Sequence, residues 1–195
     1  MIRINKEVLD YITKLYCAKN HQGIEILDIM SGQHIIEQQS NVYDVYIVKS
    51  GLAKCYLTED TGKDFIQEFF GEGEVFGEVE MFNDELSFCT IEAINQMEVF
   101  RIKRNHFTQL VETDSKLNKL ILKTLAQKIR YTALRHSYHQ SHPIRVNLLR
   151  LQKQFPNFID VIAKRDIANY LGITERSLNR NLKTLNESKN NRSIN

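Results

Sequence analysis

The 195-residue chain has no tryptophan, only two prolines and only eight glycines. So little Pro and Gly excludes collagen-like and Pro-rich disordered chains. No apolar run approaches the ~18 residues that a membrane-spanning helix needs, and the first seven residues, MIRINKE, lack the apolar segment of a secretory signal. We therefore expect a cytoplasmic protein that does not contact a membrane, of a length that suits one or two globular domains.

Cysteine is also scarce. Cys17, Cys55 and Cys89 lie far apart, their number is odd, and their spacing fits no metal-binding motif. Buried free thiols in a reduced compartment are the simplest interpretation.

The signatures of enzymes are missing as well. No Ser/His/Asp or Cys/His arrangement has supporting context, and no glycine-rich phosphate loop is present. A metal-binding β-barrel enzyme needs several close histidines, whereas His34 is the only one in the barrel region after His21. We predict that the protein is not an enzyme and has no metal or other cofactor.

The charge is divided unevenly along the chain, although the formal net charge is only +2. Residues 1–100 contain 7 Lys+Arg and 18 Asp+Glu, whereas residues 101–195 contain 19 and 6. An acidic half joined to a basic half indicates two roles, and the basic half suits a phosphate-rich partner. A basic face that only keeps the protein soluble is the alternative.

Glycine divides the chain at the same place, because seven of the eight precede residue 78. Glycine tolerates the positive φ of tight turns, so this part should consist of short strands joined by turns. Segments rich in Ile, Val, Phe and Tyr predict an antiparallel barrel or sandwich. They cover residues 25–30, 34–37, 45–49, 52–57, 65–70, 88–93 and 97–102.

A helical period follows. Apolar residues recur at helical spacing, and no Gly or Pro interrupts residues 78–142, which predicts one long helix from about 114 to 139. Leu122, Leu125 and Ile129 form a narrow apolar seam that is typical of a dimer interface. The alternative is a helix packed only on its own barrel. Pro143 ends the helix.

The last part predicts a helix-turn-helix, with helices at about 164–171 and 175–185. Gly172 permits a sharp turn and Thr174 can cap the second helix. Leu178 faces the core while polar side chains face outward, so the second helix suits the DNA major groove. The candidate DNA-binding residues are Thr174, Glu175, Arg176, Ser177, Asn179, Arg180 and Lys183. An ordinary helical hairpin is the alternative.

With these motifs in order, nearly the whole chain resembles the Crp/Fnr transcription regulators. Gly32-Gln33, the strand and turn at residues 45–54 (VYIVKSGLAK) and residues 73–78 (GEVFGE) look like the family's β-roll motifs. The long helix, the helix at 145–151 and the helix-turn-helix follow where the family has them. Residues 76–82 and 170–173 look closest to the YeiL-type subgroup.

The resemblance implies an α+β fold: an N-terminal antiparallel β-roll of the cyclic-nucleotide-binding, jelly-roll type, a long dimerisation helix and a C-terminal winged-helix-like domain. We place these parts at residues 1–113, 114–142 and 143–195. Only ten polar residues follow Leu185, so the family's wing is short or missing. The implied partners are double-stranded DNA, a second copy of the chain and RNA polymerase.

The chain departs from the family in its effector pocket, whose candidate residues are Gly77, Glu78, Ser87 and Phe88. Cyclic-AMP-binding members carry an Arg-Ser pair where Ser87 and Phe88 stand here, and Glu78 matches their ribose-binding residue. Without that Arg, Glu78 leaves a negative pocket that Phe88 fills with apolar bulk. An anionic effector is therefore disfavoured.

Three interpretations of the pocket stay open: it binds nothing, it binds a neutral or cationic ligand, or it binds a cyclic nucleotide. The cysteines are too dispersed for an iron–sulfur cluster. Haem ligation by His21, His34 or the group His136, His139 and His142 is a further alternative. In the DNA-binding part, Ala163 stands where the family often has a capping Ser or Thr.

Together these patterns predict a homodimeric, sequence-specific transcription regulator that does not depend on cyclic AMP. The alternative is an effector-binding or protein-interaction module with a degenerate DNA-binding domain.

Overall fold

A computed structural model describes residues 2–18 and 23–190, except for the side chains of 139, 140, 154 and 186–190. The chain forms two compact units, one comprising Ile2–Ile129 and the other the chain from Arg130 onward. The boundary falls inside the long helix α4 (Ser115–Ser141).

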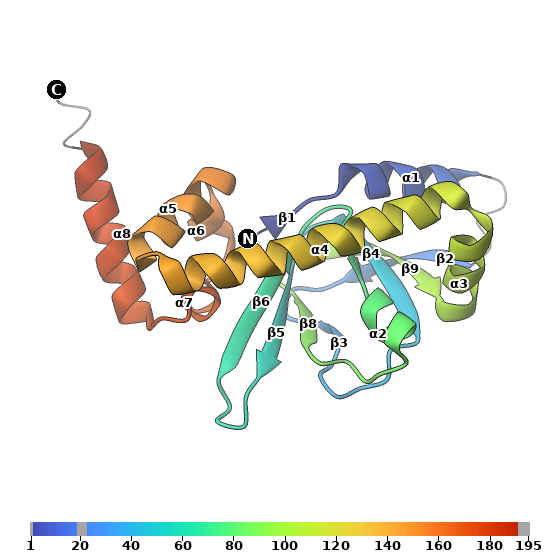
Figure 1. The fold of residues 1–195 in the computed structure, drawn as a ribbon, viewed down its shortest axis with the longest axis horizontal. Helices are drawn as coiled ribbons and strands as arrows, with labels where there is room; N and C mark the ends of the chain where they lie inside the picture. Colours follow the sequence, from blue (N-terminus) through green and yellow to red (C-terminus); the bar gives the residue numbers. More distant parts are fainter. Residues whose placement is uncertain (1, 19–22, 191–195) are drawn as a thin grey trace. The chain divides into compact units, whose positions relative to one another are not determined.

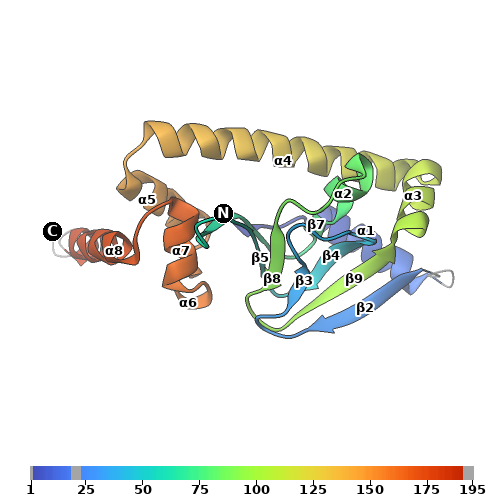
Figure 2. The ribbon, with the colours of Figure 1, turned by 90° about the horizontal axis from the view of Figure 1, so that it is seen from below.

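The first unit is built on two sheets (Figures 1 and 2). One sheet has the strand order β1-β6-β5-β8-β3 and the other has the order β2-β9-β4-β7. All neighbouring strands are antiparallel except β1 and β6, which are parallel. The strands are β1 (Ile2–Arg3), β2 (Ile24–Ile29), β3 (His34–Ile36), β4 (Asp44–Ser50), β5 (Ala53–Thr58), β6 (Asp64–Phe70), β7 (Val75–Phe76), β8 (Thr90–Ala93) and β9 (Met97–Lys103).

The core of this unit follows from the period of two along the strands. Val45 and Ile47 on β4 are fully buried, whereas Tyr46 between them is half-buried. Its ring stacks on Phe76, with ring centres 5.2 Å apart, and Phe76 stacks on Phe70 at 5.8 Å. These aromatic contacts fill the space beside the β6–β7 turn with apolar atoms.

Four helices belong to this unit: α1 (Lys6–Cys17), α2 (Glu78–Asn83), α3 (Arg104–Thr113) and the first part of α4. Val8 of α1, Phe107 of α3, and Leu117 and Ile121 of α4 are buried in one cluster with strand residues. One face of α4 therefore packs on its own β-roll. This packing was expected under the alternative in which the helix does not serve only as a dimer interface.

The second unit is helical. It contains the rest of α4, then α5 (Ile144–Gln154), α6 (Phe158–Val161), α7 (Lys164–Leu171) and α8 (Glu175–Asn190). Pro143 precedes α5, where its fixed φ and missing N–H are tolerated. Each of α5, α6, α7 and α8 contributes buried apolar residues, as does Ile162 directly after α6. The helical ones include Leu148, Leu151, Phe158, Ile167, Leu171, Leu178 and Leu185.

The seven predicted strands are all present, with bounds shifted by at most two residues. The elements β1, β7, α1, α2, α3 and α6 were not predicted. β1, β7, α2 and α6 are too short for a periodic pattern, whereas the apolar helical patterns of α1 and α3 were not recognised. α4 and α7 match their predicted ranges closely, whereas α8 continues to Asn190 instead of stopping near residue 185. α8 runs to the last described residue, Asn190, so the predicted short or missing wing lies outside the described residues.

The expectation that all three thiols are buried was wrong for one of them. Cys55 and Cys89 are buried, but Cys17 is exposed at the end of α1. Its helix buries Val8 and Ile12 on one face, and Cys17 lies off that face. None of the helices in the described residues is both long enough and apolar enough to span a bilayer.

Candidate functional site

The helix α8 presents a polar face to solvent. Arg176, Asn179, Arg180 and Lys183 are exposed, as is Glu175, while Leu178 and Leu185 are buried against the rest of the unit. The spacing of seven between these two leucines, about two helical turns, explains the division, because it places them on one side of the helix. All seven residues predicted for this surface therefore lie at the start of α8 or along its first turns.

The turn before α8 has the predicted local structure. Gly172 adopts φ of 66°, and the N–H of Ile173 donates to the carbonyl oxygen of Ala168 at 3.0 Å. Thr174 Oγ1 accepts a hydrogen bond from the Ser177 N–H at 3.2 Å, which caps the helix. Ala163 precedes α7 without a side-chain cap, as its sequence requires.

The β-roll contains a second candidate site, at the start of α2. Gly77 has φ of 87°, and a Cβ atom there would lie 2.6 Å from the Asp44 carbonyl oxygen, so only glycine fits. The next residue, Glu78, is only 1% exposed and forms an ion pair with Lys128 of α4. Lys128 Nζ also donates to the Val75 carbonyl oxygen at 2.6 Å and lies 5.5 Å from the centre of the Phe70 ring.

This ion pair bears on the expectation that Glu78 leaves the pocket negative. The carboxylate is buried, but a cation fifty residues further along the chain compensates it. Sequence reasoning did not identify Lys128 because it lies fifty residues from Glu78, on a helix outside the pocket motif. The period of α4 carries a usable signal, since Leu117, Ile121 and Thr124 place Lys128 on the same buried side.

Two further buried carboxylates lie beside this pair. Arg3 Nη2 lies 3.0 Å from Glu74 Oε2, and Arg3 Nε lies 3.3 Å from Glu68 Oε2. Burial raises the pKa of Glu74, while Arg3 and Lys128 act in the opposite direction. With Glu78, this group holds three carboxylates and two cations, so the site keeps a negative excess even though each carboxylate has a partner.

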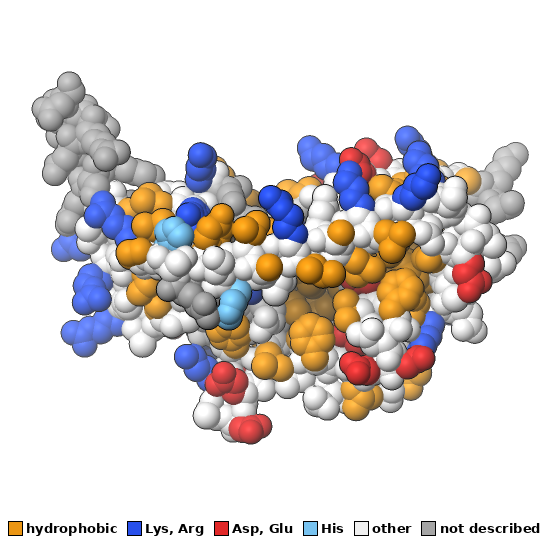
Figure 3. Space-filling view, viewed as in Figure 1, with side chains coloured by type: hydrophobic (Ala, Val, Ile, Leu, Met, Phe, Trp, Pro, Cys, Tyr) orange, Lys and Arg blue, Asp and Glu red, His pale blue; other side chains and the backbone are white. Residues whose placement is uncertain are grey.

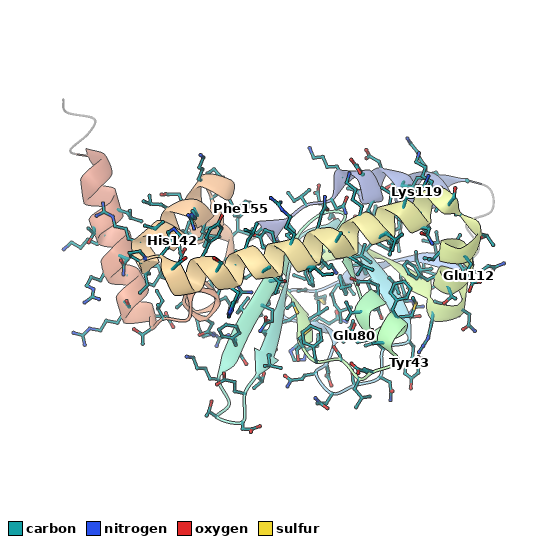
Figure 4. All side chains as sticks on the ribbon, in the orientation of Figure 1. Tyr43, Glu80, Glu112, Lys119, His142 and Phe155 are labelled. Atoms are coloured by element: carbon teal, nitrogen blue, oxygen red, sulfur yellow. The ribbon has the colours of Figure 1, made fainter. Side chains whose placement is uncertain are left out.

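Ser87 and Phe88 face in opposite directions. Ser87 is fully buried, and its Oγ lies 2.8 Å from the Cys89 carbonyl oxygen and 3.1 Å from Glu80 Oε1 on α2 (Figure 4). Phe88 is 51% exposed. The prediction that Phe88 fills the pocket was therefore wrong: in the bent segment before β8 (Thr90–Ala93), Ser87 and Cys89 are buried and Phe88 is exposed.

The two buried thiols meet near this site. Cys55 Sγ and Cys89 Sγ lie 2.8 Å apart, and both residues are free cysteines. The hydrogen bond with Cys89, together with burial, raises the pKa of the Cys55 thiol well above its ordinary value. The Cys55 thiol therefore stays protonated at neutral pH and has little nucleophilic character.

A third feature is the outward face of α4 in the first unit. Leu122 is 60% exposed and Ile129 is 73% exposed, whereas Leu125 is half-buried. Leu122 and Leu125 also line an open apolar groove of about 340 Å³ together with Phe82. Figure 3 shows hydrophobic side chains gathered along α4 and over α2 on this face. The predicted seam is thus exposed at two of its three positions, while Leu125 belongs partly to the packed face.

Metal ligation has no support from this geometry. Within the described side chains, which exclude His21 and His139, no group of three or more His, Cys, Asp and Glu residues is arranged to hold a metal ion. His34 lies 3.4 Å from the Tyr56 hydroxyl and 3.6 Å from Glu92, two groups of its own sheet.

A family model for the cyclic nucleotide-binding domain matches residues 27–114, which includes the candidate pocket. Curated relatives match the same half. The lysophospholipase nte1 of Aspergillus oryzae is 26% identical over 108 residues, and NTE1 of Coccidioides immitis is 27% identical over 109. The match covers 55% and 56% of this chain but spans only 7% of those proteins.

Solved structures match over most of the chain. The c-di-GMP-responsive global regulator CLP of Xanthomonas campestris aligns with a TM-score of 0.74 and 15% identity, covering 95% of this chain and 93% of that one. FixK2 of Bradyrhizobium japonicum aligns with a TM-score of 0.72 and 20% identity, covering 85% of this chain and 86% of that one. A CooA mutant of Carboxydothermus hydrogenoformans aligns with a TM-score of 0.73 and 14% identity, covering 91% of this chain and 84% of that one. At these identities the likeness establishes the fold.

Proposed function

Given that the chain has a Crp/Fnr-like fold and carries a cyclic nucleotide-binding domain at residues 27–114, we propose that it is a homodimeric, sequence-specific DNA-binding transcription regulator and not an enzyme. One observation carries the proposal. The surface of α8 combines exposed Arg176, Asn179, Arg180 and Lys183 with buried Leu178 on the opposite side. A helix that is anchored on one face and cationic on the other suits the major groove of DNA.

In this proposal the side chains of α8 have different roles. Arg176 and Arg180 donate to base edges, since a guanidinium pairs with guanine O6 and N7 through two hydrogen bonds. Asn179 and Ser177 reach other base edges or phosphates, and Lys183 contacts a phosphate. Thr174 acts through the backbone, because its hydroxyl is used to cap α8.

Dimerisation brings two copies of α8 to one DNA site. The support is the exposed apolar face of α4, since Leu122 and Ile129 would otherwise remain in water. A two-fold dimer reads an inverted repeat whose half-sites lie about one helical turn apart.

The first test removes one candidate base contact. Arg180→Ala should weaken binding to the preferred duplex by about 1–3 kcal/mol, relax selectivity at one base position and change binding to random duplex little. Fluorescence anisotropy against both duplexes measures this difference. Lys183→Ala is the contrast, because loss of a phosphate contact should weaken both duplexes alike and lower the salt dependence. Equal weakening of both duplexes by Arg180→Ala would make Arg180 a phosphate contact and contradict its proposed role.

The second test concerns cyclic nucleotides. We expect cyclic AMP and cyclic GMP to bind with dissociation constants above about 1 mM in calorimetry at physiological salt. The physical reason is that Arg3 and Lys128 are committed to three buried carboxylates, and Ser87 Oγ lies against Glu80. A phosphate placed there meets no spare cation. Micromolar binding would contradict this interpretation and require Lys128 to leave Glu78.

A further inference from the structure

The second unit contains a cavity of about 270 Å³ beside the end of α4, α5 and α7. Its lining consists of three arginines, three tyrosines, three leucines and one asparagine. No Asp or Glu is among these lining residues, which all lie between positions 130 and 171. The charged and aromatic members are Arg130, Arg135, Arg150, Tyr131, Tyr138 and Tyr170.

Two of the guanidinium groups are stacked on tyrosine rings. The Arg150 guanidinium carbon lies 3.8 Å from the centre of the Tyr138 ring, and that of Arg135 lies 4.5 Å from the centre of the Tyr170 ring. Stacking fixes the plane of a guanidinium and leaves the N–H groups at its edge directed sideways. Such an edge binds the two oxygens of a carboxylate or phosphate.

One N–H group of the Arg150 guanidinium makes no hydrogen bond within the described residues. Its Nη2 lies 3.3 Å from His142 Nε2, near the C-terminal end of α4 (Figure 4). Its Nη1 is buried and has no hydrogen-bond partner in the described part of the chain. A buried N–H without an acceptor is unfavourable, and a charged one more so. An acceptor in the cavity would remove this penalty.

We propose that this cavity binds a small organic anion, with one carboxylate or phosphate group on an apolar body about the size of one aromatic ring. The anion pairs with the Arg150 edge and offsets the repulsion between neighbouring guanidinium groups. The apolar body contacts Leu134, Leu151 and the tyrosine rings. The volume is near the lower end for small-molecule sites, which begin at roughly 300 Å³.

The cavity is connected to the helix pair of the second unit through α7, which contributes Tyr170 and Leu171 to the lining and leads through Gly172 into α8. If the proposed function holds, an anion that fixes α4, α5 and α7 together adjusts the DNA-binding surface from within its own unit. Binding of the anion itself does not depend on that function.

The test is calorimetric titration of the full chain with phenyl phosphate and with benzoate, using uncharged benzyl alcohol as the control ligand. We expect both anions to bind with dissociation constants below about 1 mM, and benzyl alcohol to bind at least ~10-fold more weakly. Binding of benzyl alcohol as tight as that of the anions would contradict the role of the arginines.

Three variants locate the site. Arg150→Gln should weaken phenyl phosphate at least ~10-fold. Leu134→Trp keeps all three arginines but fills the cavity, so it should also abolish binding; Leu134 is 37% exposed, which lets the protein fold around the larger ring. Arg180→Ala, outside the cavity, should leave phenyl phosphate binding unchanged even if it abolishes specific DNA binding.

Two outcomes would overturn the proposal. One is no heat of binding for either anion at concentrations of roughly 10 mM. The other is binding that survives Arg150→Gln and Leu134→Trp but is lost in Arg180→Ala, which would place the anion on the α8 surface. Thermal unfolding of each variant, compared with the parent, verifies that the fold is intact.

Discussion

Replacing Lys128 by methionine is expected to lower the free energy of unfolding by about 3–5 kcal/mol. Methionine keeps most of the apolar stem that lies over Phe70, but it removes the cation paired with the 1%-exposed Glu78. The variant leaves a buried carboxylate without its counter-charge and the Val75 carbonyl oxygen without its donor. Urea denaturation followed by circular dichroism measures the change.

A matched control comes from the same helix. Lys123 pairs with Glu7 at 2.6 Å, but both side chains are more than half exposed. Lys123→Met should therefore cost less than about 1 kcal/mol. In addition, Glu78→Gln in the Lys128→Met background should recover part of the loss, because it removes the buried charge. Similar losses in the Lys123 and Lys128 variants would show that the buried pair does not stabilise the β-roll.

The double substitution Leu122→Glu and Ile129→Glu is expected to convert a dimer into monomers. Both side chains are more than half exposed in the single chain, so the substitutions leave the fold of a subunit intact. In a two-fold dimer they place four carboxylates along one seam, and burying like charges there is strongly unfavourable. Sedimentation velocity measures the mass, and DNA affinity should fall because a monomer engages only one half-site.

Leu149→Glu provides the control for this experiment. Leu149 on α5 is 42% exposed and lies outside the α4 seam. That variant should remain a dimer. If Leu122→Glu with Ile129→Glu also remains a dimer, the interface lies elsewhere on the chain. Leu125 is unsuitable for this test because it is half-buried in the groove beside Phe82.

The elements that sequence reasoning located correctly are those with strong local patterns. β4, β9 and α4 have long apolar periods. Gly172 marks the turn between α7 and α8, and Thr174 caps α8. All of these are short-range signals. The pairing of Lys128 with Glu78 joins residues fifty positions apart. No local pattern encodes such a contact, so the pocket was expected to be more negative than it is.

Sequence reasoning also failed to predict which way individual side chains point. Phe88 was placed in the pocket by its position in a family motif, yet in the segment before β8 Ser87 is buried and Phe88 is exposed. The cavity beside Arg150 was not predicted either. Its arginines and tyrosines come from α4, α5 and α7, and the packing of these helices against one another cannot be derived from local sequence patterns.

The central claim, sequence-specific DNA binding by α8, is tested most directly by selection of bound duplexes from a random pool by the full chain. The account predicts enrichment of an inverted repeat with half-sites about one helical turn apart, and loss of one conserved base position in each half-site when Arg180→Ala is used instead. Recovery of a pool with no enriched sequence, retained equally by the parent and by Arg180→Ala, would contradict the claim and favour a module that acts through ligand or protein contacts.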